Sequence, residues 1–146
     1  MGGGVAPVSI RFVKGDLFCH ENLRVLAHGC NCAGAMGKGI AVEFRSRFPL
    51  MYEEYKKRCV EGRFRLGDVF YWEEAGWVVF NLGTQKTWRV KADLSSIDAS
   101  VRAMAGLAER KGLARIGLPR IGAGLGGLHW GGCLQFVGAN WRCDIC

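Results

Sequence analysis

The chain is short of the features that would place it in a membrane, in a fibre or outside the cell. Only 3 of its 146 residues are proline, and 49% are apolar and 23% charged, a balance typical of globular proteins. Its longest apolar runs, such as residues 77–80, fall far short of the roughly 20 residues that a membrane-spanning helix needs. The chain does not open with a secretion signal, which would be a basic segment followed by an apolar core. Its 7 cysteines are an odd number and cannot all pair, so we expect reduced thiols in a cytosol-like compartment.

The chain has room for one domain and therefore for one principal cleft. Its 146 residues are enough to bury a core but too few for two independent ones. We expect residues 1–7 to be a disordered leader and residues 8–146 to fold as one unit. We also expect a monomer that does not associate with membranes and that works in the cytoplasm, or in the nucleus if the organism is a eukaryote.

The net charge of +7 favours anionic ligands, either phosphates or nucleic acid. The basic residues are scattered instead of forming one run with interleaved aromatic residues, so solvated helix faces account for them as well. A Cys-x-x-Cys pair stands at residues 143–146, but a zinc knuckle needs a second pair, and Cys30 and Cys32 beside His28 have the wrong spacing. We therefore predict neither a metal ion nor a cofactor.

Strand and helix patterns alternate along the chain. Ile40, Phe44 and Phe48 recur at helical spacing, and Pro49 starts a second helix that runs to about residue 61. A third helix is predicted over residues 94–111, with Asp93 as its N-cap. The other predicted elements are strands over residues 9–13, 23–30, 68–73, 77–82 and 115–118, a short helix over 130–137, and an unfinished edge strand over 141–146. This order predicts an α/β fold with three layers, α/β/α, around a mixed sheet, because strands that return in parallel need a helical crossover.

Two glycine-rich loops follow predicted strands. The first, residues 31–40, leads into a helix whose exposed N–H groups favour an anion, and its glycines let a phosphate approach the backbone. The second, residues 121–127, follows another strand, and two such loops at one edge of a sheet can hold a diphosphate. Glycine-rich turns also serve only to reverse the chain. Neither loop matches a P-loop or a Rossmann fingerprint.

Four short motifs, in their order and spacing, resemble a macrodomain. The motifs are Val13-Lys14-Gly15-Asp16-Leu17-Phe18, Leu26-Ala27-His28, Met36-Gly37-Lys38-Gly39-Ile40-Ala41 and Pro119-Arg120-Ile121-Gly122-Ala123-Gly124-Leu125. The chain is most similar to the branch that contains the terminal ADP-ribose protein glycohydrolase and the antitoxins that remove ADP-ribose from DNA. The resemblance covers residues 10–130 and implies a macrodomain-like fold.

The resemblance implies a site for ADP-ribose. Asp16 would accept a hydrogen bond from the adenine amino group, beside the backbone of Leu17, although an ordinary turn aspartate is the alternative. The distal ribose and the diphosphate would lie along Asn31, Met36, Gly37, Lys38, Gly39 and Ile40, with Thr84 in the same set. The second phosphate loop would be formed by Arg120, Ile121, Gly122, Ala123, Gly124, Leu125 and Gly126.

The sequence departs from the family at the two groups that carry out catalysis. In the glycohydrolase branch a lysine after the fourth strand attacks the anomeric carbon, and an aspartate at the end of the second phosphate loop assists. Here Gln85 stands at the lysine position, with Lys86 beside it, and Gly126 stands at the aspartate position. Adjacent strand residues point to opposite faces, so Lys86 can replace the lysine only if the backbone there is irregular. Lys86 and Gln85 are the catalytic candidates.

Three functions are open to such a chain. It can hydrolyse an ADP-ribosyl ester, either on acidic side chains of proteins or in O-acetyl-ADP-ribose, with a water positioned against the distal ribose. It can be a reader that binds ADP-ribose on modified proteins without turnover. It can also release ADP-ribose from DNA, which the basic charge favours. A fold alone does not fix the chemistry, and ester hydrolysis is the first expectation.

Overall fold

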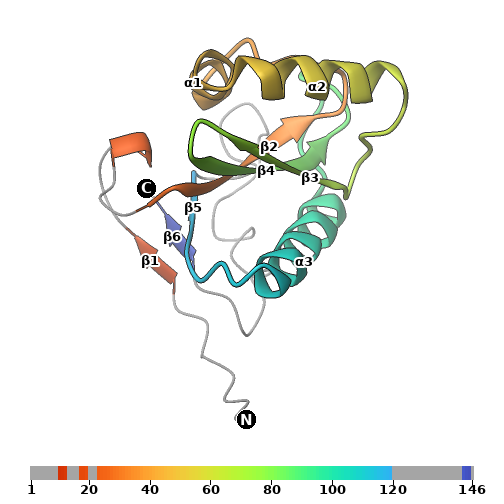
Figure 1. Cartoon of the computed structure of the whole chain (residues 1–146). Coiled ribbons are helices and arrows are strands. Elements are labelled where there is room, and N and C mark those ends of the chain that lie inside the picture. The colour runs from red at the N-terminus through yellow and green to blue at the C-terminus, as the bar shows by residue number, and fades with distance from the viewer. Residues whose placement is uncertain (1–9, 13–16, 20–22, 120–142, 146) are drawn as a thin grey trace.

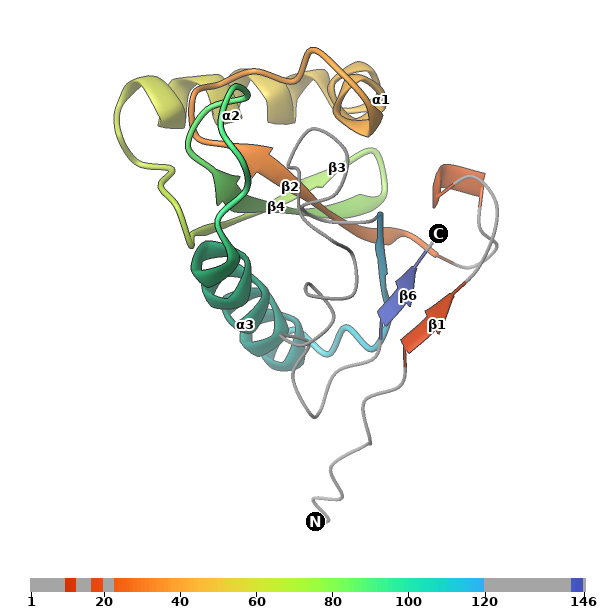
Figure 2. The same ribbon diagram turned by 180° about the vertical axis from the view of Figure 1, so that it is seen from behind.

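The computed structural model describes residues 10–12, 17–19, 23–119 and 143–145. Figure 1 shows a sheet with α1 and α2 on one face and α3 on the other, and Figure 2 shows the same layers from behind. The strands are β1 (Ile10–Phe12), β2 (Val25–Asn31), β3 (Val69–Glu74), β4 (Trp77–Gln85), β5 (Ile116–Leu118) and β6 (Cys143–Ile145). The helices are the short 3-10 helix η1 (Leu17–Cys19), α1 (Ile40–Arg47), α2 (Pro49–Val60) and α3 (Leu94–Arg110). The expected three-layer α/β/α architecture is confirmed.

The six strands form one mixed sheet in the order β1-β6-β5-β2-β4-β3. β2 runs parallel to β4 on one side and to β5 on the other, and β5, β6 and β1 also pair in parallel. β3 is antiparallel to β4, and the two form a hairpin, in which Glu74 pairs with Trp77. The five parallel strands therefore point their carboxyl ends to the same edge of the sheet.

Two apolar layers hold the helices to the sheet. On one face, Ile97 and Met104 of α3 pack with Phe80 of β4 in a buried cluster. On the other face, Phe44 of α1 and Met51 of α2 belong to a second cluster that also includes η1. The four-residue and three-residue spacing of apolar positions along α3 is what gives that helix a buried face.

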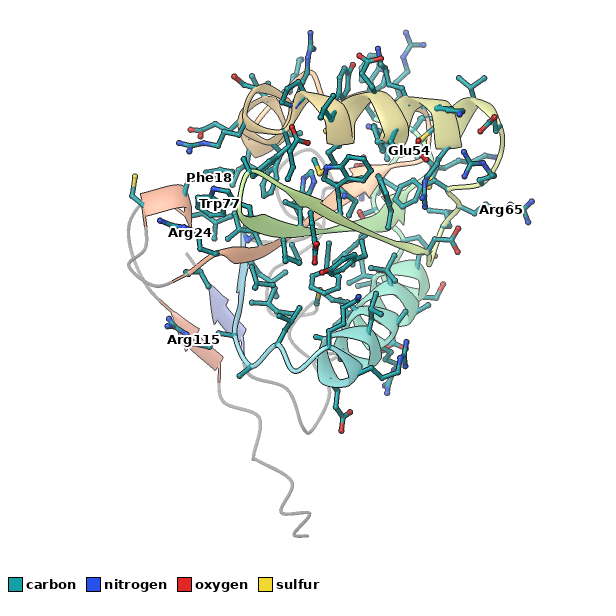
Figure 3. All side chains as sticks on the ribbon, viewed as in Figure 1. Phe18, Arg24, Glu54, Arg65, Trp77 and Arg115 are labelled. Atoms are coloured by element: carbon teal, nitrogen blue, oxygen red, sulfur yellow. The ribbon has the colours of Figure 1, made fainter. Side chains whose placement is uncertain are left out.

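The amino ends of β2 and β4 are closed by aromatic packing. The ring centroids of Phe18 and Trp77 lie 5.9 Å apart, and the Arg24 guanidinium lies 4.6 Å from the centroid of the Trp77 ring. Figure 3 shows these three residues together on one side of the molecule. The opposite edge, at the carboxyl ends, carries the glycine-rich loop.

Most expected elements are confirmed, and one is corrected. Asp93 is the N-cap of α3, and its side chain accepts from the backbone N–H of Ser96 at 3.0 Å. The C-terminal strand was expected at an edge, but β6 lies between β1 and β5, because parallel pairing joins strands that are far apart in the sequence. The helix expected over residues 130–137 lies outside the described residues. No helix in the described part of the chain is long and apolar enough to cross a bilayer.

Candidate functional site

The carboxyl ends of β2 and β4 bring two of the segments singled out in the sequence to one edge of the sheet. β2 leads through residues 32–39 into α1, and β4 leads through residues 86–93 to α3. The two connections are joined directly, because the backbone N–H of Cys32 donates to the carbonyl of Gln85 at 2.8 Å. The first glycine-rich loop and the stretch around Gln85 are therefore neighbours.

The side chain of Asn31 shapes the first glycine-rich loop from within. Its Oδ1 accepts from the backbone N–H groups of Ala33 at 3.0 Å and Ala35 at 3.2 Å, and its Nδ2 donates to the carbonyl of Ala35 at 2.8 Å. Asn31 is buried, with 8% of its surface exposed. Its carboxamide sets the path of the loop, and a contact between Asn31 and a ligand stays a prediction.

Tyr55 of α2 holds Asn31 in place through a hydrogen bond. The Tyr55 hydroxyl donates to the backbone carbonyl of Asn31 at 2.7 Å and lies 3.0 Å from Asn31 Oδ1. Tyr55 is fully buried, and burial raises the pKa of its phenol well above the usual value, so the hydroxyl stays a donor. Helix α2 thus fixes the point at which the loop leaves β2.

The far half of the loop exposes its backbone at the start of α1. Gly37, Lys38 and Gly39 are exposed, and Ile40 is 37% exposed. Gly39, the N-cap of α1, has φ 64° and ψ −150°, a conformation close to glycine-only, and no side chain of the described residues caps the helix. Among the described residues, no atom lies within 4 Å of a Cβ added to Gly37. Backbone N–H groups that no described side chain caps suit an anion such as a phosphate.

Two residues predicted to bind the ligand bury their side chains. Met36 is 2% exposed and Leu17 is 3% exposed, and both belong to the apolar layer beneath α1 and α2. The Met36 side chain anchors the glycine-rich loop to the core. A ligand contact at either residue would come from the backbone, and it stays a prediction.

The backbone is irregular at the end of β4, where the family has its lysine. Two consecutive residues of β2 pair with residues 83 and 85 of β4, so Thr84 is an extra residue that forms a bulge. Thr84 is buried, and its carbonyl accepts from the N–H of Asp93 at 2.8 Å. The strand ends at Gln85, and Lys86 lies exposed in a bend. The irregular backbone that Lys86 would need is present, while its catalytic role stays a prediction.

The turn after β4 is braced by its own hydrogen bonds. The Gln85 side chain donates from Nε2 to the carbonyl of Val90, and the N–H of Arg89 donates to Thr87 Oγ1 at 3.2 Å. Trp88 lies within this turn with 49% of its surface exposed, and the Arg89 guanidinium lies 4.6 Å from the centroid of its ring. The turn therefore presents an exposed aromatic ring close to the end of β4, the strand that is hydrogen-bonded to the glycine-rich loop.

A buried polar cluster of His28, Cys30 and Asn81 lies between the sheet and α1. Asn81 Nδ2 donates to the carbonyl of Phe70 at 3.1 Å, so Asn81 Oδ1 accepts from His28 Nε2 at 2.7 Å. The His28 ring also stacks on Phe44, with centroids 3.8 Å apart. Burial lowers the pKa of His28 to about 4 and raises the pKa of the Cys30 thiol well above its usual value. Both side chains are neutral core groups and not a catalytic base or a thiolate.

Part of the predicted site lies outside the described residues. This part contains Asp16 at the adenine end and the second phosphate loop, Arg120, Ile121, Gly122, Ala123, Gly124, Leu125 and Gly126. Cys146 of the C-terminal cysteine pair lies there as well. Among the residues that the structure describes, no group of three Cys, His, Asp or Glu side chains is arranged to hold a metal ion.

The sequence motifs left out two residues that the structure brings to this edge. Tyr55 follows Met51 by four positions on the buried face of α2, which indicates a core residue but not that its hydroxyl reaches Asn31. Trp88 stands between two basic residues, Lys86 and Arg89, and its exposure is visible only in the structure. An aromatic residue among cations was the available signal for a binding role.

Comparisons with known proteins agree with the fold and the motifs. The chain matches the Macro domain family model over residues 27–137. It is 33% identical over 126 residues to a Mycobacterium tuberculosis protein named DNA ADP-ribosyl glycohydrolase, which covers 83% of this chain but only 35% of that protein. The macrodomain of Mycobacterium tuberculosis DarG superimposes with a TM-score of 0.86 at 29% identity, covering 94% of this chain and 97% of that one.

A second group of relatives carries another name. The chain is 30% identical over 135 residues to the ADP-ribose 1''-phosphate phosphatase of Candida albicans, a match that covers 83% of this chain and 86% of that protein. This relative is matched over most of its length, whereas the chain spans 35% of the mycobacterial relative. The two names share one ligand, ADP-ribose, and differ in the bond that is broken.

Proposed function

The chain belongs to the macrodomain family, and from that membership we propose that it binds ADP-ribose and hydrolyses the bond between ADP-ribose and a modified molecule. The observation that carries the proposal is the hydrogen bond from Cys32 to Gln85 at 2.8 Å. It holds the loop that would bind the diphosphate beside the strand end that would carry the catalytic group.

The proposed diphosphate site is the exposed backbone at residues 37–40. Asn31 and Tyr55 fix the start of this loop, and Met36 anchors its middle in the core, so the N–H groups are held in place before the ligand binds. Lys38 adds a positive charge, and no acidic residue occurs between positions 31 and 42. Asp16 and residues 120–126 would complete the site at the adenine and at the second phosphate.

The proposed reaction breaks one bond at the distal ribose. A water supplies the hydroxyl that bonds to the anomeric carbon, the bond from that carbon to the leaving group breaks, and the leaving group takes up the remaining proton. The carboxamide of Gln85 is already bonded to Val90, so we assign Gln85 the positioning of the turn. Lys86, exposed in the bend beside it, is the group assigned to catalysis. Either it stabilises the charge that develops, or Nζ bonds to the anomeric carbon as the leaving group departs, and water then breaks that carbon–nitrogen bond and restores the amine.

The linkage that we propose as substrate is ADP-ribose on DNA, ahead of the protein ester expected from the sequence alone. The relative named for that activity is 33% identical over 83% of this chain. The net charge of +7 also suits a polyanion. Hydrolysis of a protein ester and binding without turnover are the competing readings that the release assay separates.

A second candidate reaction is hydrolysis of the phosphate monoester in ADP-ribose 1''-phosphate. The support is the Candida albicans relative, which the chain matches over 86% of that protein's length. The same loops would hold the ADP-ribose in both reactions. The bond that is broken differs: it lies at the phosphate in the second reaction and between the distal ribose and a base or a carboxylate in the first.

The test is a release assay on several linkages side by side. Purified protein is incubated with ADP-ribosylated thymidine in single-stranded DNA, with protein carrying glutamate-linked ADP-ribose, and with ADP-ribose 1''-phosphate. We expect free ADP-ribose to appear fastest from the DNA. Fastest release from the protein would favour the ester, release of phosphate would favour the second candidate, and binding without any release would make the chain a reader.

A further inference from the structure

We propose that the turn formed by residues 86–91 is a platform for the polynucleotide strand that carries the ADP-ribose, with a base stacked on Trp88 and the strand's phosphates beside Arg89 and Lys91. This inference rests on the proposed function, because it names how the DNA around the modified base is held. It adds a determinant for the strand that is separate from the ADP-ribose loops.

The Trp88 ring has the exposure and the support that a stacking platform needs. Trp88 is 49% exposed, although large aromatic side chains usually bury most of their surface. The Arg89 guanidinium covers the ring at 4.6 Å from its centroid. A base on the opposite face would extend this stack, and base–aromatic stacking tolerates any sequence because every base has a flat face.

The turn is held in one shape before a strand binds. The Gln85 side chain donates to the carbonyl of Val90, which ties the two ends of the turn together. Within it, Thr87 accepts from the N–H of Arg89 through Oγ1 at 3.2 Å. The N–H of Asp93 donates to the carbonyl of Thr84 at 2.8 Å and fixes the turn to the start of α3. A braced turn loses little conformational freedom when it binds.

The charges of the turn favour a polyanion over a peptide. Lys86, Arg89 and Lys91 lie in it, and the sequence has no acidic residue from position 75 to position 92. In the described part of the chain, none of these three cations forms an ion pair, whereas cations on α2 such as Arg58 pair with glutamates on the same helix. Unpaired cations beside an exposed ring are the arrangement that binds single strands.

The position of the turn suits a strand that emerges from the ADP-ribose site. The turn follows β4 directly. The Cys32–Gln85 hydrogen bond joins Gln85, the residue just before the turn, to the glycine-rich loop. A nucleotide next to the modified base would therefore leave the site past Trp88. We commit to a single strand of DNA as the occupant, because the exposed Trp88 ring can stack on an unpaired base but not on one already stacked in a duplex.

The test separates strand binding from ADP-ribose binding. Fluorescence anisotropy measures the affinity for an unmodified oligo-dT of about 10 nucleotides, a length within the site sizes of single-strand binders. Calorimetry measures the affinity for ADP-ribose. Trp88→Ala is compared with Trp88→Phe, which keeps a stacking ring, and with Leu50→Ala, which removes an exposed apolar side chain from α2. Lys91→Ala is compared with Lys57→Ala, an exposed lysine on α2.

We expect Trp88→Ala to weaken oligonucleotide binding by about tenfold or more and Trp88→Phe to retain most of it. ADP-ribose affinity should stay within about twofold of the parent in both variants. Lys91→Ala should reduce the slope of log affinity against log salt by about 0.7, and Lys57→Ala should not. With modified substrates, Trp88→Ala should raise KM for the oligonucleotide and leave release from ADP-ribosyl thymidine nucleoside unchanged.

The outcomes that overturn the platform are distinct from failure of the proposed hydrolysis. A parent protein that does not bind the oligonucleotide, or a loss with Leu50→Ala as large as with Trp88→Ala, would overturn it. So would a higher KM of Trp88→Ala for ADP-ribosylated protein alone, which would make the turn a peptide contact. If no linkage is cleaved, the hydrolysis proposal fails, and the anisotropy measurements still decide the platform.

Discussion

The hydroxyl of Tyr55 on α2 donates to the backbone carbonyl of Asn31, the last residue of β2, at 2.7 Å. This bond ties a helix on one face of the sheet to the residue at which the glycine-rich loop begins. Tyr55→Phe removes the only atom that makes the bond and leaves a buried carbonyl without this donor. We expect the free energy of unfolding to fall by about 1–2 kcal/mol in a denaturant titration.

The same substitution should also loosen the loop that binds the ligand. We expect ADP-ribose affinity of Tyr55→Phe to fall severalfold in calorimetry, because Asn31 loses its support. Tyr52→Phe is the matched control, since Tyr52 lies on the same helix and its hydroxyl forms no hydrogen bond within the described residues. Equal ligand affinities for the two variants would mean that the Tyr55 bond serves stability alone.

Alanine substitutions at two glycines of the loop should have different effects, one on ADP-ribose affinity and the other on the free energy of unfolding. No described residue lies within 4 Å of a Cβ added to Gly37, so Gly37→Ala should leave the free energy of unfolding unchanged and weaken ADP-ribose binding by about tenfold or more, as its methyl group enters the phosphate's space. Gly39 has a φ of 64°, and Gly39→Ala should lower the free energy of unfolding by about 1–3 kcal/mol.

Gly76 supplies the control for this pair of substitutions. It has a φ of 82° in the turn between β3 and β4, away from the site, and no atom of the described part of the chain lies within 4 Å of an added Cβ. Gly76→Ala should therefore destabilise the fold much as Gly39→Ala does and keep full ADP-ribose affinity. Unchanged ligand binding in Gly37→Ala would show that this loop does not hold the phosphates.

Substitution of Lys86 should slow release without weakening binding. We expect Lys86→Ala to lower kcat for release from the best substrate by about 100-fold or more, because the group acts only as charge develops. Lys86→Arg keeps the charge but not a nucleophilic amine, so recovery with arginine indicates electrostatic stabilisation. A borohydride-reduced adduct of the parent, lost in Lys86→Arg, indicates attack by the amine. Full release by Lys86→Ala would remove lysine from the mechanism.

Local patterns predicted the elements of this fold, while their long-range pairing had to come from the structure. Apolar spacing and Asp93 defined α3, and Pro49 defined the start of α2, because these signals act over a few residues. The place of β6 between β1 and β5 depends on contacts across most of the chain. Side-chain spacing therefore predicts strands more readily than it predicts their neighbours.

The same distinction between local patterns and long-range contacts applies to the candidate site. The resemblance to the family singled out the loop of residues 36–40 and Gln85 as candidates, because each lies within a short continuous motif, and their roles stay predictions. The support of Asn31 by Tyr55 depends on a helix crossing the sheet, and the bulge at Thr84 depends on the register of β4 against β2. Neither relationship has a signature in the order of residues along the chain.

The buried His28 should make the fold sensitive to acid. Its pKa is lowered by burial from the ordinary value of 6.5 to about 4, so between these values the unfolded chain takes up a proton that the folded chain refuses. The free energy of unfolding is therefore at its full value above about pH 6.5 and falls as the pH is lowered toward 4, by about 3 kcal/mol in total. His28→Gln can still donate to Asn81 but does not titrate, so its free energy of unfolding should fall less over this range. Denaturant titrations of both proteins at intervals from pH 7 to pH 4 measure the difference, and parallel curves would show that His28 is protonated in the folded state.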